Sequence, residues 1–204
     1  MRTATDELCA RLECALALEG AAHSDNTLNP DLGPVQGPLT PAAVLIPVVD
    51  RADGAHLLLT QRTDHLPTHQ GQVAFPGGKI DPGDGGPMEA ALREAQEEIG
   101  LGPDRVRVLG MLPPYETRSG FSVHGVIGIV RPGFQLTLNE GEVADAFEVP
   151  LPFLLDRANH TKVSGEWNGK KRYFYAMTYE KRFIWGVTAG IIRMLADRMA
   201  EGEP

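Results

Sequence analysis

The stretch AALREAQEEIG, residues 90–100, places Glu94, Glu97 and Glu98 within five positions of one predicted helix. A helix turns by about 100° per residue, so the three carboxylates fall within a sector of about 100° on one side. Each close pair of like charges costs a few tenths of a kcal/mol, which Arg93, four residues before Glu97, offsets in part. The cluster is therefore either the solvated face of a surface helix or a site for a hard cation such as Mg²⁺ or Mn²⁺.

Two consecutive glycines precede this helix, in the string FPGG at residues 75–78. Glycine lets a ligand or an ion approach the backbone closely, although a Gly-Gly pair after a strand is also a common turn. Residues 79–86 are predicted to form a loop. Pro87 suits the first turn of a helix that runs to about Ile99 and ends at Gly100.

Together, the FPGG string and LREAQEEIGL, residues 92–101, resemble the Nudix box, the loop-helix-loop signature of Nudix hydrolases. The end of the box matches at every defined position. Two departures are Asp84, where the box usually has Glu, and a spacer to Arg93 that is one residue longer than the common form. The resemblance implies an α/β fold, an α/β/α sandwich on a mixed β-sheet, that hydrolyses a nucleoside diphosphate linked to another moiety.

The longer box, beginning GGKIDPGD at residues 77–84, is similar to that of a Nudix subgroup that cleaves coenzyme A and its thioesters. Residues 57–78, LLLTQRTDHLPTHQGQVAFPGG, resemble the motif that precedes the box in these coenzyme A pyrophosphatases. Pro67 carries no charge and stands where that motif has an Arg, so the phosphate or nucleotide contact expected there has no donor at this position. Arg62, His65 and His69 are the candidates to replace it. Those histidines are equally well explained as ordinary loop residues.

The resemblance extends through PYETRSGF at residues 114–121 and IWGVTA at residues 184–189, and covers roughly residues 40–195. We expect residues 1–41 to form an N-terminal helix and an irregular arm, and residues 42–204 to form the Nudix domain.

Periodicity predicts two helices outside the box. An amphipathic helix is expected over residues 5–19, and a second one, FIWGVTAGIIRMLADRMA, closes the chain over residues 183–200.

The resemblance also implies a role for individual residues. The expected ligands of Mg²⁺ or Mn²⁺ are Gly78, through its carbonyl, Glu94, Glu97 and Glu98. The expected catalytic residues are Arg93, which orients a box carboxylate, Glu94, Glu97, Glu98 and Glu142. The expected substrate-binding residues are Arg62, Gly77, Gly78 and Arg118. The general base is either a glutamate of the box or one of a downstream loop. Glu142 is the loop candidate and Glu140 is its neighbour, and each is about equally well explained as a solvated loop charge. Glu116 is a third candidate.

The composition and charge of the chain indicate which partners and which cellular compartment are expected. The chain has 204 residues, 19 Lys and Arg and 27 Asp and Glu, which gives a net charge of −8 and disfavours nucleic-acid binding. Cys9 and Cys14 are expected to be free thiols in a reducing compartment. No stretch resembles a signal or a membrane span, so a cytoplasmic protein with no membrane partner is expected. Homodimers are frequent in this superfamily, and a homodimer is therefore possible.

Two alternatives to coenzyme A hydrolysis stay open. The loss of the motif Arg at Pro67 keeps ADP-ribose, NADH or another nucleoside diphosphate derivative as substrates. A non-catalytic Nudix-fold binding module is disfavoured, because such modules usually lose box carboxylates and this chain keeps Glu94, Glu97 and Glu98.

Overall fold

The structure is a computed structural model, and it describes residues 4–20, 23–35, 37–66, 68–167 and 169–202. In this part of the chain, nine strands form a mixed sheet and three more form a small antiparallel sheet. The strands of the large sheet are β1 (His23–Ser24), β2 (Thr40–Arg51), β3 (Gly54–Arg62), β4 (Val73–Ala74), β5 (Gly77–Lys79), β6 (Val106–Met111), β7 (Tyr115–Glu116), β8 (Phe121–Val130) and β9 (Val143–Pro150). The small sheet contains β10 (Thr161–Trp167), β11 (Lys170–Tyr179) and β12 (Arg182–Trp185). The α-helices are α1 (Ala4–Ala17), α2 (Pro87–Ile99), α3 (Leu151–Leu155) and α4 (Gly186–Glu201), and short 3₁₀ turns cover Asp25–Leu28, Pro30–Leu32, Pro103–Arg105 and Arg157–Asn159.

The centre of the large sheet is the parallel pair β2 and β8, which runs from Thr40 opposite Phe121 to Val49 opposite Val130. Both strands are largely buried, which is why their sequences read as nearly continuous apolar runs. The strand order is β1-β7-β8-β2-β3-β4, while β5 pairs with β2, β6 with β8 and β9 with β3.

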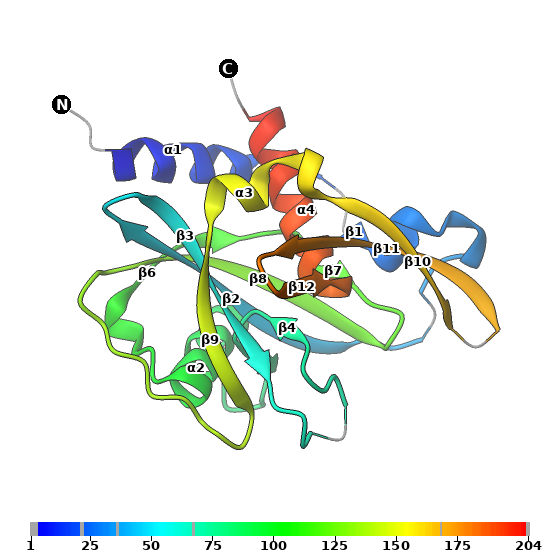
Figure 1. Cartoon of the computed structure of the whole chain (residues 1–204), viewed down its shortest axis with the longest axis horizontal. Coiled ribbons are helices and arrows are strands. Elements are labelled where there is room, and N and C mark those ends of the chain that lie inside the picture. The colour runs from blue at the N-terminus through cyan, green and yellow to red at the C-terminus, as the bar shows by residue number, and fades with distance from the viewer. Residues whose placement is uncertain (1–3, 21–22, 36, 67, 168, 203–204) are drawn as a thin grey trace.

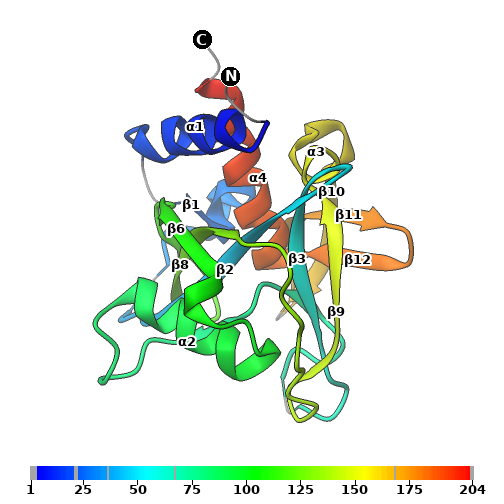
Figure 2. The same ribbon diagram turned by 90° about the vertical axis from the view of Figure 1, so that its left-hand side faces the viewer.

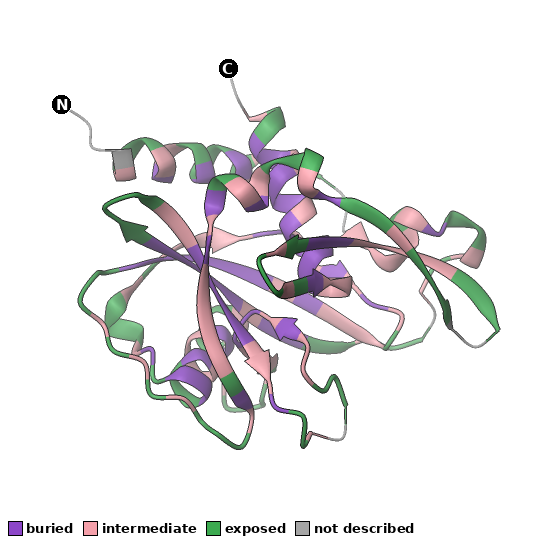
Figure 3. Ribbon diagram, viewed as in Figure 1, coloured by how far each residue is buried: buried purple, intermediate pink, exposed green. Residues whose placement is uncertain are grey.

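Helices cover both faces of the large sheet, as Figures 1 and 2 show. Helix α2 packs on one face, where Leu45 and Val49 of β2 meet Ala91 and Ala95 of the helix. Helices α1, α3 and α4 pack on the other face, on the side of Ile46. The alternation of β2 side chains between two buried clusters follows the two-residue period of a strand. Figure 3 shows that the buried residues are concentrated in the central strands of the large sheet and in the helices that cover it. This arrangement is the predicted α/β/α sandwich with a mixed sheet.

The N-terminal segment belongs to the same core. Helix α1 buries Leu12 and Ala15 completely, and the Arg198 side chain donates a hydrogen bond to the Ala15 carbonyl at 2.9 Å. The arm that follows is less irregular than predicted, because β1 pairs in parallel with β7. Strand β2 also begins at Thr40, two residues before the predicted domain start.

The predicted closing helix begins three residues too early. Phe183, Ile184 and Trp185 form most of β12, which pairs with β11, and α4 begins only at Gly186. Gly186 has a φ of 64°, a left-handed conformation that favours glycine and separates the strand from the helix. Phe183 and Trp185 therefore lie on the β11–β12 hairpin and not on a helix.

Within the described residues, no helix has both the length and the apolar character needed to cross a membrane.

Candidate functional site

Helix α2 carries the acidic cluster, in which Glu98 is buried, Glu94 is half-buried and Glu97 is exposed. Its buried residues include Ala90, Ala91 and Ala95, whose small side chains let the helix approach β2 and β5 closely. Gly100 ends the helix in the left-handed conformation, and its N–H donates to the Gln96 carbonyl at 3.0 Å. The predicted helix and its end are confirmed.

Glu98 is the most buried of the three carboxylates, with only 4 % of the residue exposed. Its Oε2 accepts a hydrogen bond from the Gly77 N–H at 3.2 Å, and its Oε1 lies 3.9 Å from Nη1 of Arg62. Burial is the main cause that raises the pKa of this carboxyl to about 7. The nearby Glu94 and Glu142 charges contribute to the increase, whereas the Gly77 N–H and Arg62 oppose it. An additional positive charge beside Glu98 would favour the ionised carboxylate.

Glu94 lies directly over the second glycine of the FPGG string. A Cβ at Gly78 would overlap the Glu94 carboxylate, so a residue with a side chain would displace this glutamate. A Cβ at Gly77 would likewise overlap the backbone of Ala43 and Val44 on β2. Burial raises the pKa of Glu94, as does the proximity of Glu97 and Glu142, although Arg93 counteracts it. The two glycines thus allow the strand end and the carboxylates to meet.

Arg93 joins the box loop to the box helix. Its guanidinium makes two hydrogen bonds to the Asp84 carboxylate, at 2.9 and 3.0 Å, and one to the Lys79 carbonyl at 3.2 Å. Its Nη1 also lies 3.0 Å from both Glu94 Oε1 and Glu97 Oε2. The hydrogen bonds from Arg93 are the main cause that lowers the pKa of Asp84. The sequence marks Asp84 only as the residue that stands where the box usually has Glu. In the structure, Asp84 is the bidentate partner of Arg93.

We expect Arg93→Lys to lower kcat by about 10²-fold, because misplacement of catalytic groups by an ångström has an effect of this size. A lysine ammonium is a point charge and cannot reproduce the planar bidentate contact with Asp84 while it reaches Lys79, Glu94 and Glu97. The measurement is steady-state kinetics together with the thermal unfolding midpoint, which should fall as well. Arg105→Lys, at an exposed ion pair, is the matched control. Equal kcat in wild type and Arg93→Lys would show that the bidentate contact between Arg93 and Asp84 is not needed for activity.

The loop before β9 brings Glu142 to the cluster. This loop caps the end of α2, because the Asn139 N–H donates to the Glu98 carbonyl at 2.8 Å and the Thr137 N–H to the Ile99 carbonyl at 3.0 Å. Asn139 also donates to Glu142 Oε1 at 3.3 Å. The Glu142 charge is close enough to raise the pKa of both Glu94 and Glu98.

The two alternatives to Glu142 lie differently. Glu140 is exposed on the same loop, and Glu116 is on β7 opposite Ser122. Of the three candidates, Glu142 is the one whose charge raises the pKa of Glu94 and Glu98, whereas Glu116 lies on another part of the sheet.

The predicted substrate residues separate into two groups. Arg62, Gly77 and Gly78 lie at Glu98 and Glu94, as described above. Arg118 instead holds the N-terminal arm, since its Nη1 bonds the Asn26 side chain at 2.8 Å and the Gly33 carbonyl at 3.2 Å. Its assignment as a substrate residue therefore gains no support from the geometry. Pro67 lies outside the described residues.

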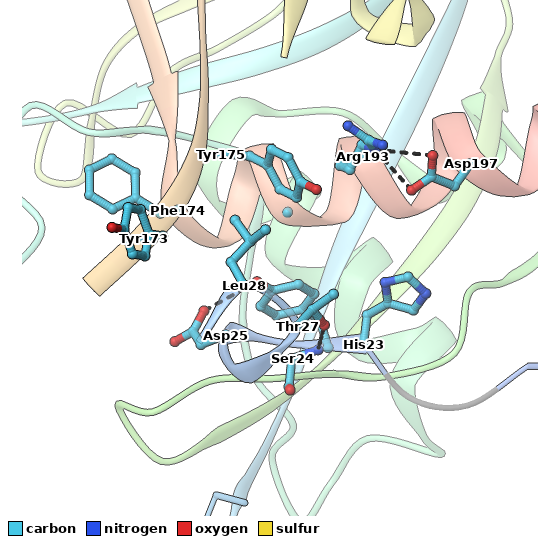
Figure 4. A pocket seen from close by; sticks show the side chains of 12 residues that line it. His23, Ser24, Asp25, Thr27, Leu28, Tyr173, Phe174, Tyr175, Arg193 and Asp197 are labelled. Carbon is cyan, nitrogen blue, oxygen red and sulfur yellow. Dashed lines mark hydrogen bonds and ion pairs between the residues drawn. The ribbon is translucent and has the colours of Figure 1, made fainter. Parts of the chain in front are cut away.

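The arm also encloses a small cavity of about 40 Å³ against β11 and α4, shown in Figure 4. Its lining includes His23, Asp25, Tyr175 and Arg193, and Arg193 is paired with Asp197 at 2.9 Å. A cavity of this size holds about one water molecule. It is therefore too small for a nucleotide, and the acidic cluster remains the candidate reaction site.

The cluster fits a divalent cation by its chemistry. Its donors are carboxylate oxygens, the ligands that Mg²⁺ and Mn²⁺ prefer. Burial is the main cause that raises the pKa values of Glu94 and Glu98, and neighbouring carboxylates add to the increase. In the described residues, no three His, Cys, Asp or Glu side chains already converge as a finished cation site. Glu94 and Glu97 face Arg93, and Glu98 faces the Gly77 N–H, so binding a cation requires rotation of these side chains.

The raised pKa of Glu98 predicts a pH dependence of stability in metal-free protein. The folded state binds this proton more tightly than the unfolded chain, whose carboxyl has its ordinary pKa of 4.5. The associated stability is fully present below pH 4.5 and is lost as the pH rises through about 7, a change on the order of 3 kcal/mol. Urea unfolding in EDTA between pH 4.5 and 8 measures it, and subtracting the Glu98→Gln profile isolates this group. Parallel profiles of wild type and variant would contradict the assignment.

The NUDIX domain family matches residues 39–167. Curated relatives named "Uncharacterized Nudix hydrolase NudL" include that of Citrobacter koseri, 48% identical over 76% of this chain and 80% of its own length, and that of Yersinia enterocolitica, 47% identical over 78% and 80%. Among solved structures, the MutT protein of Methanosarcina mazei has a TM-score of 0.54 at 17% identity, covering 84% of this chain and all of its own. That likeness concerns the fold alone.

Proposed function

Because this chain belongs to the Nudix family of hydrolases, we propose that it cleaves the diphosphate bond of coenzyme A or its thioesters. Water attacks one phosphorus atom of the diphosphate, the bond to the bridging oxygen breaks, and 4′-phosphopantetheine and adenosine 3′,5′-bisphosphate leave. A cytoplasmic location and a homodimer are part of the same proposal.

One observation carries the choice of substrate. The segment 57–78, which resembles the motif of coenzyme A pyrophosphatases, includes most of β3, all of β4 and the first two residues of β5. Arg62 from its middle and Gly77 from its end both contact Glu98. The motif thus supplies the groups next to the most buried carboxylate, where a substrate diphosphate has to lie.

Nudix hydrolases generally need divalent metal ions. We assign Mg²⁺ or Mn²⁺ to Glu94, Glu97 and Glu98, with the Gly78 carbonyl as a further ligand. Such a cation, when bound, neutralises phosphate charge and lowers the pKa of a coordinated water.

The residues of the chain supply position and proton transfer. Arg93 holds the box loop on α2 and keeps Glu94 and Glu97 on the site side of the helix. Glu142 accepts the proton of the attacking water, because it is the loop carboxylate near both Glu94 and Glu98. Arg62, 3.9 Å from Glu98, favours the ionised form of that carboxyl.

A substrate panel tests this proposal. The protein is incubated with Mg²⁺ or Mn²⁺ and coenzyme A, acetyl-coenzyme A, ADP-ribose or NADH, and products are identified by mass spectrometry. The proposal expects 4′-phosphopantetheine from coenzyme A at a higher kcat/KM than any AMP released from the others. Preferential cleavage of ADP-ribose or NADH would instead support the alternative substrates, and no turnover of the panel would favour a binding module.

A further inference from the structure

Asn139 lies where the loop before β9 meets the end of α2. Its N–H donates to the Glu98 carbonyl at 2.8 Å, and its own carbonyl accepts from the N–H groups of Glu142 and Val143, both at 2.9 Å. The backbone of Asn139 is therefore attached to the helix residue that carries the most buried carboxylate of the cluster. It is attached equally to the loop residue that we propose as the general base.

The side-chain amide of Asn139 is oriented by the turn that it closes. Its Oδ1 accepts the Gly141 N–H at 3.2 Å, the local bond that an asparagine side chain typically makes two residues on. An amide group has an acceptor at one end and donors at the other. The bond to Gly141 therefore leaves Nδ2 as the end that faces Glu142, and Nδ2 donates to Glu142 Oε1 at 3.3 Å.

Strand β3 holds the same loop from the other side. Thr63, which is only 6% exposed, follows β3 directly. Its N–H donates to the Glu142 carbonyl at 3.0 Å, and its hydroxyl donates to the Gly141 carbonyl at 3.4 Å. The backbone of Glu142 is thus fixed between α2 and β3, on the strand whose Arg62 lies 3.9 Å from Glu98.

A fixed backbone does not decide where the Glu142 carboxylate points, because a glutamate side chain has several rotatable bonds. Glu142 is half-buried, so solvent competes for its oxygens. In the described part of the chain, Asn139 is the one side chain that donates a hydrogen bond to this carboxylate. The bond engages Oε1 and leaves Oε2 to accept a proton, which a general base does only from within hydrogen-bond reach.

We propose that Asn139 is a positioning residue that directs the Glu142 carboxylate toward the carboxylate cluster. This inference rests on the proposed function, because it requires Glu142 to accept the proton of the attacking water. It does not depend on which nucleoside diphosphate derivative is cleaved. Asn139 lies outside the box and outside the motif before it, so neither resemblance assigns it a role.

Two substitutions separate the possible roles of the Asn139 side chain. Asn139→Asp keeps an oxygen for the Gly141 N–H but loses the donor to Glu142, whereas Asn139→Ala loses both. We expect kcat to fall about tenfold or more in both variants, because a hydrogen bond to a charged group contributes this much. KM should change little, and the thermal unfolding midpoint should fall only in Asn139→Ala.

Other patterns would overturn the proposal. A role in the turn alone predicts that kcat falls only in Asn139→Ala, together with the midpoint. An effect of the added negative charge alone predicts that kcat falls only in Asn139→Asp. Asn159→Asp, which loses a donor to the Phe153 carbonyl in another turn, is the matched control and should keep wild-type kcat.

A double-mutant cycle shows whether Asn139 acts through Glu142. In the Glu142→Gln background the base is already absent, so Asn139→Ala should lower kcat by no more than about a further twofold. Losses that multiply, as for independent residues, would overturn the proposal. The cycle is measured with coenzyme A and with the compound of the substrate panel that wild type cleaves fastest.

The outcomes distinguish this inference from the proposed function. If wild type cleaves ADP-ribose or NADH and leaves coenzyme A intact, a cycle without independent losses keeps the positioning role while the coenzyme A proposal fails. If coenzyme A is cleaved and Glu142→Gln is inactive, but Asn139→Asp has wild-type kcat, the opposite holds.

Crystal structures of wild type and Asn139→Asp test the positioning without turnover. The wild-type structure should keep the bond from Nδ2 to Glu142 Oε1, and in the variant the Glu142 carboxylate should turn away from residue 139. This measurement decides the role of Asn139 even if no compound of the panel is cleaved. An unchanged Glu142 side chain in the variant would overturn the proposal.

Discussion

Glu98→Gln is expected to lower kcat by about 10³-fold or more, because a carboxylate that holds a catalytic cation is worth several kcal/mol of transition-state stabilisation. Glutamine keeps the size of the side chain and an oxygen that accepts the Gly77 N–H, so the local packing remains. It removes only the charge, which burial already disfavours, as the raised pKa of Glu98 shows. The variant should therefore fold with stability equal to or above that of wild type at pH 8 in the absence of metal.

Two comparisons make this result specific. Glu89→Gln on the same helix keeps the acceptor for the Gly85 N–H and should retain wild-type kcat. Single-turnover rates with saturating substrate and Mg²⁺ distinguish a slower chemical step from weaker substrate binding. A Glu98→Gln variant with wild-type kcat would exclude Glu98 from the reaction and leave it a structural acceptor for Gly77.

Glu142→Gln is expected to lower kcat by 10²- to 10⁴-fold, on the order of what a general base contributes. The loop should keep its place, because its backbone bonds from Asn139 and Thr137 to the end of α2 do not involve the Glu142 carboxylate. The loss should diminish at high pH, since hydroxide then replaces the missing base. Rates of coenzyme A cleavage from pH 6 to 10 measure both effects.

Glu140→Gln discriminates between neighbouring loop carboxylates. Glu140 is exposed, and we expect this variant to retain activity within about twofold, as surface changes usually do. Loss of activity in Glu140→Gln with retention in Glu142→Gln would exchange their roles. Retention in both would move the base into the box itself.

Local signals explain which parts of the fold were predictable. Pro87 and Gly100 mark the ends of α2, and the spacing of its glutamates places them on one side whatever the rest of the chain does. The string Phe183-Ile184-Trp185 suits a strand as well as a helix, and only its pairing with β11, across the turn, decides for the strand. The predicted start of the closing helix was therefore wrong in a segment whose structure depends on pairing with β11.

The site shows the same division. The carboxylates and glycines of the box are predicted by the motif. The position of Glu142 depends instead on a contact between distant segments, the hydrogen bond from the Asn139 N–H to the backbone carbonyl of Glu98. Arg118 has the residue type of a phosphate ligand, yet its partners are Asn26, Leu32 and Gly33 of the arm. A motif thus indicates which residue types occur, and tertiary contacts decide what each of them faces.

We propose that Glu94, Glu97 and Glu98 together bind a catalytic divalent cation. Titration of metal-free protein with Mn²⁺, followed by electron paramagnetic resonance of the free ion, tests it directly. We expect at least one bound Mn²⁺ per chain. Its affinity should rise between pH 6 and 8 as Glu98 loses its proton, and it should fall at least tenfold in Glu98→Gln. Equal affinity for Mn²⁺ in wild type and Glu98→Gln at pH 8 would contradict it.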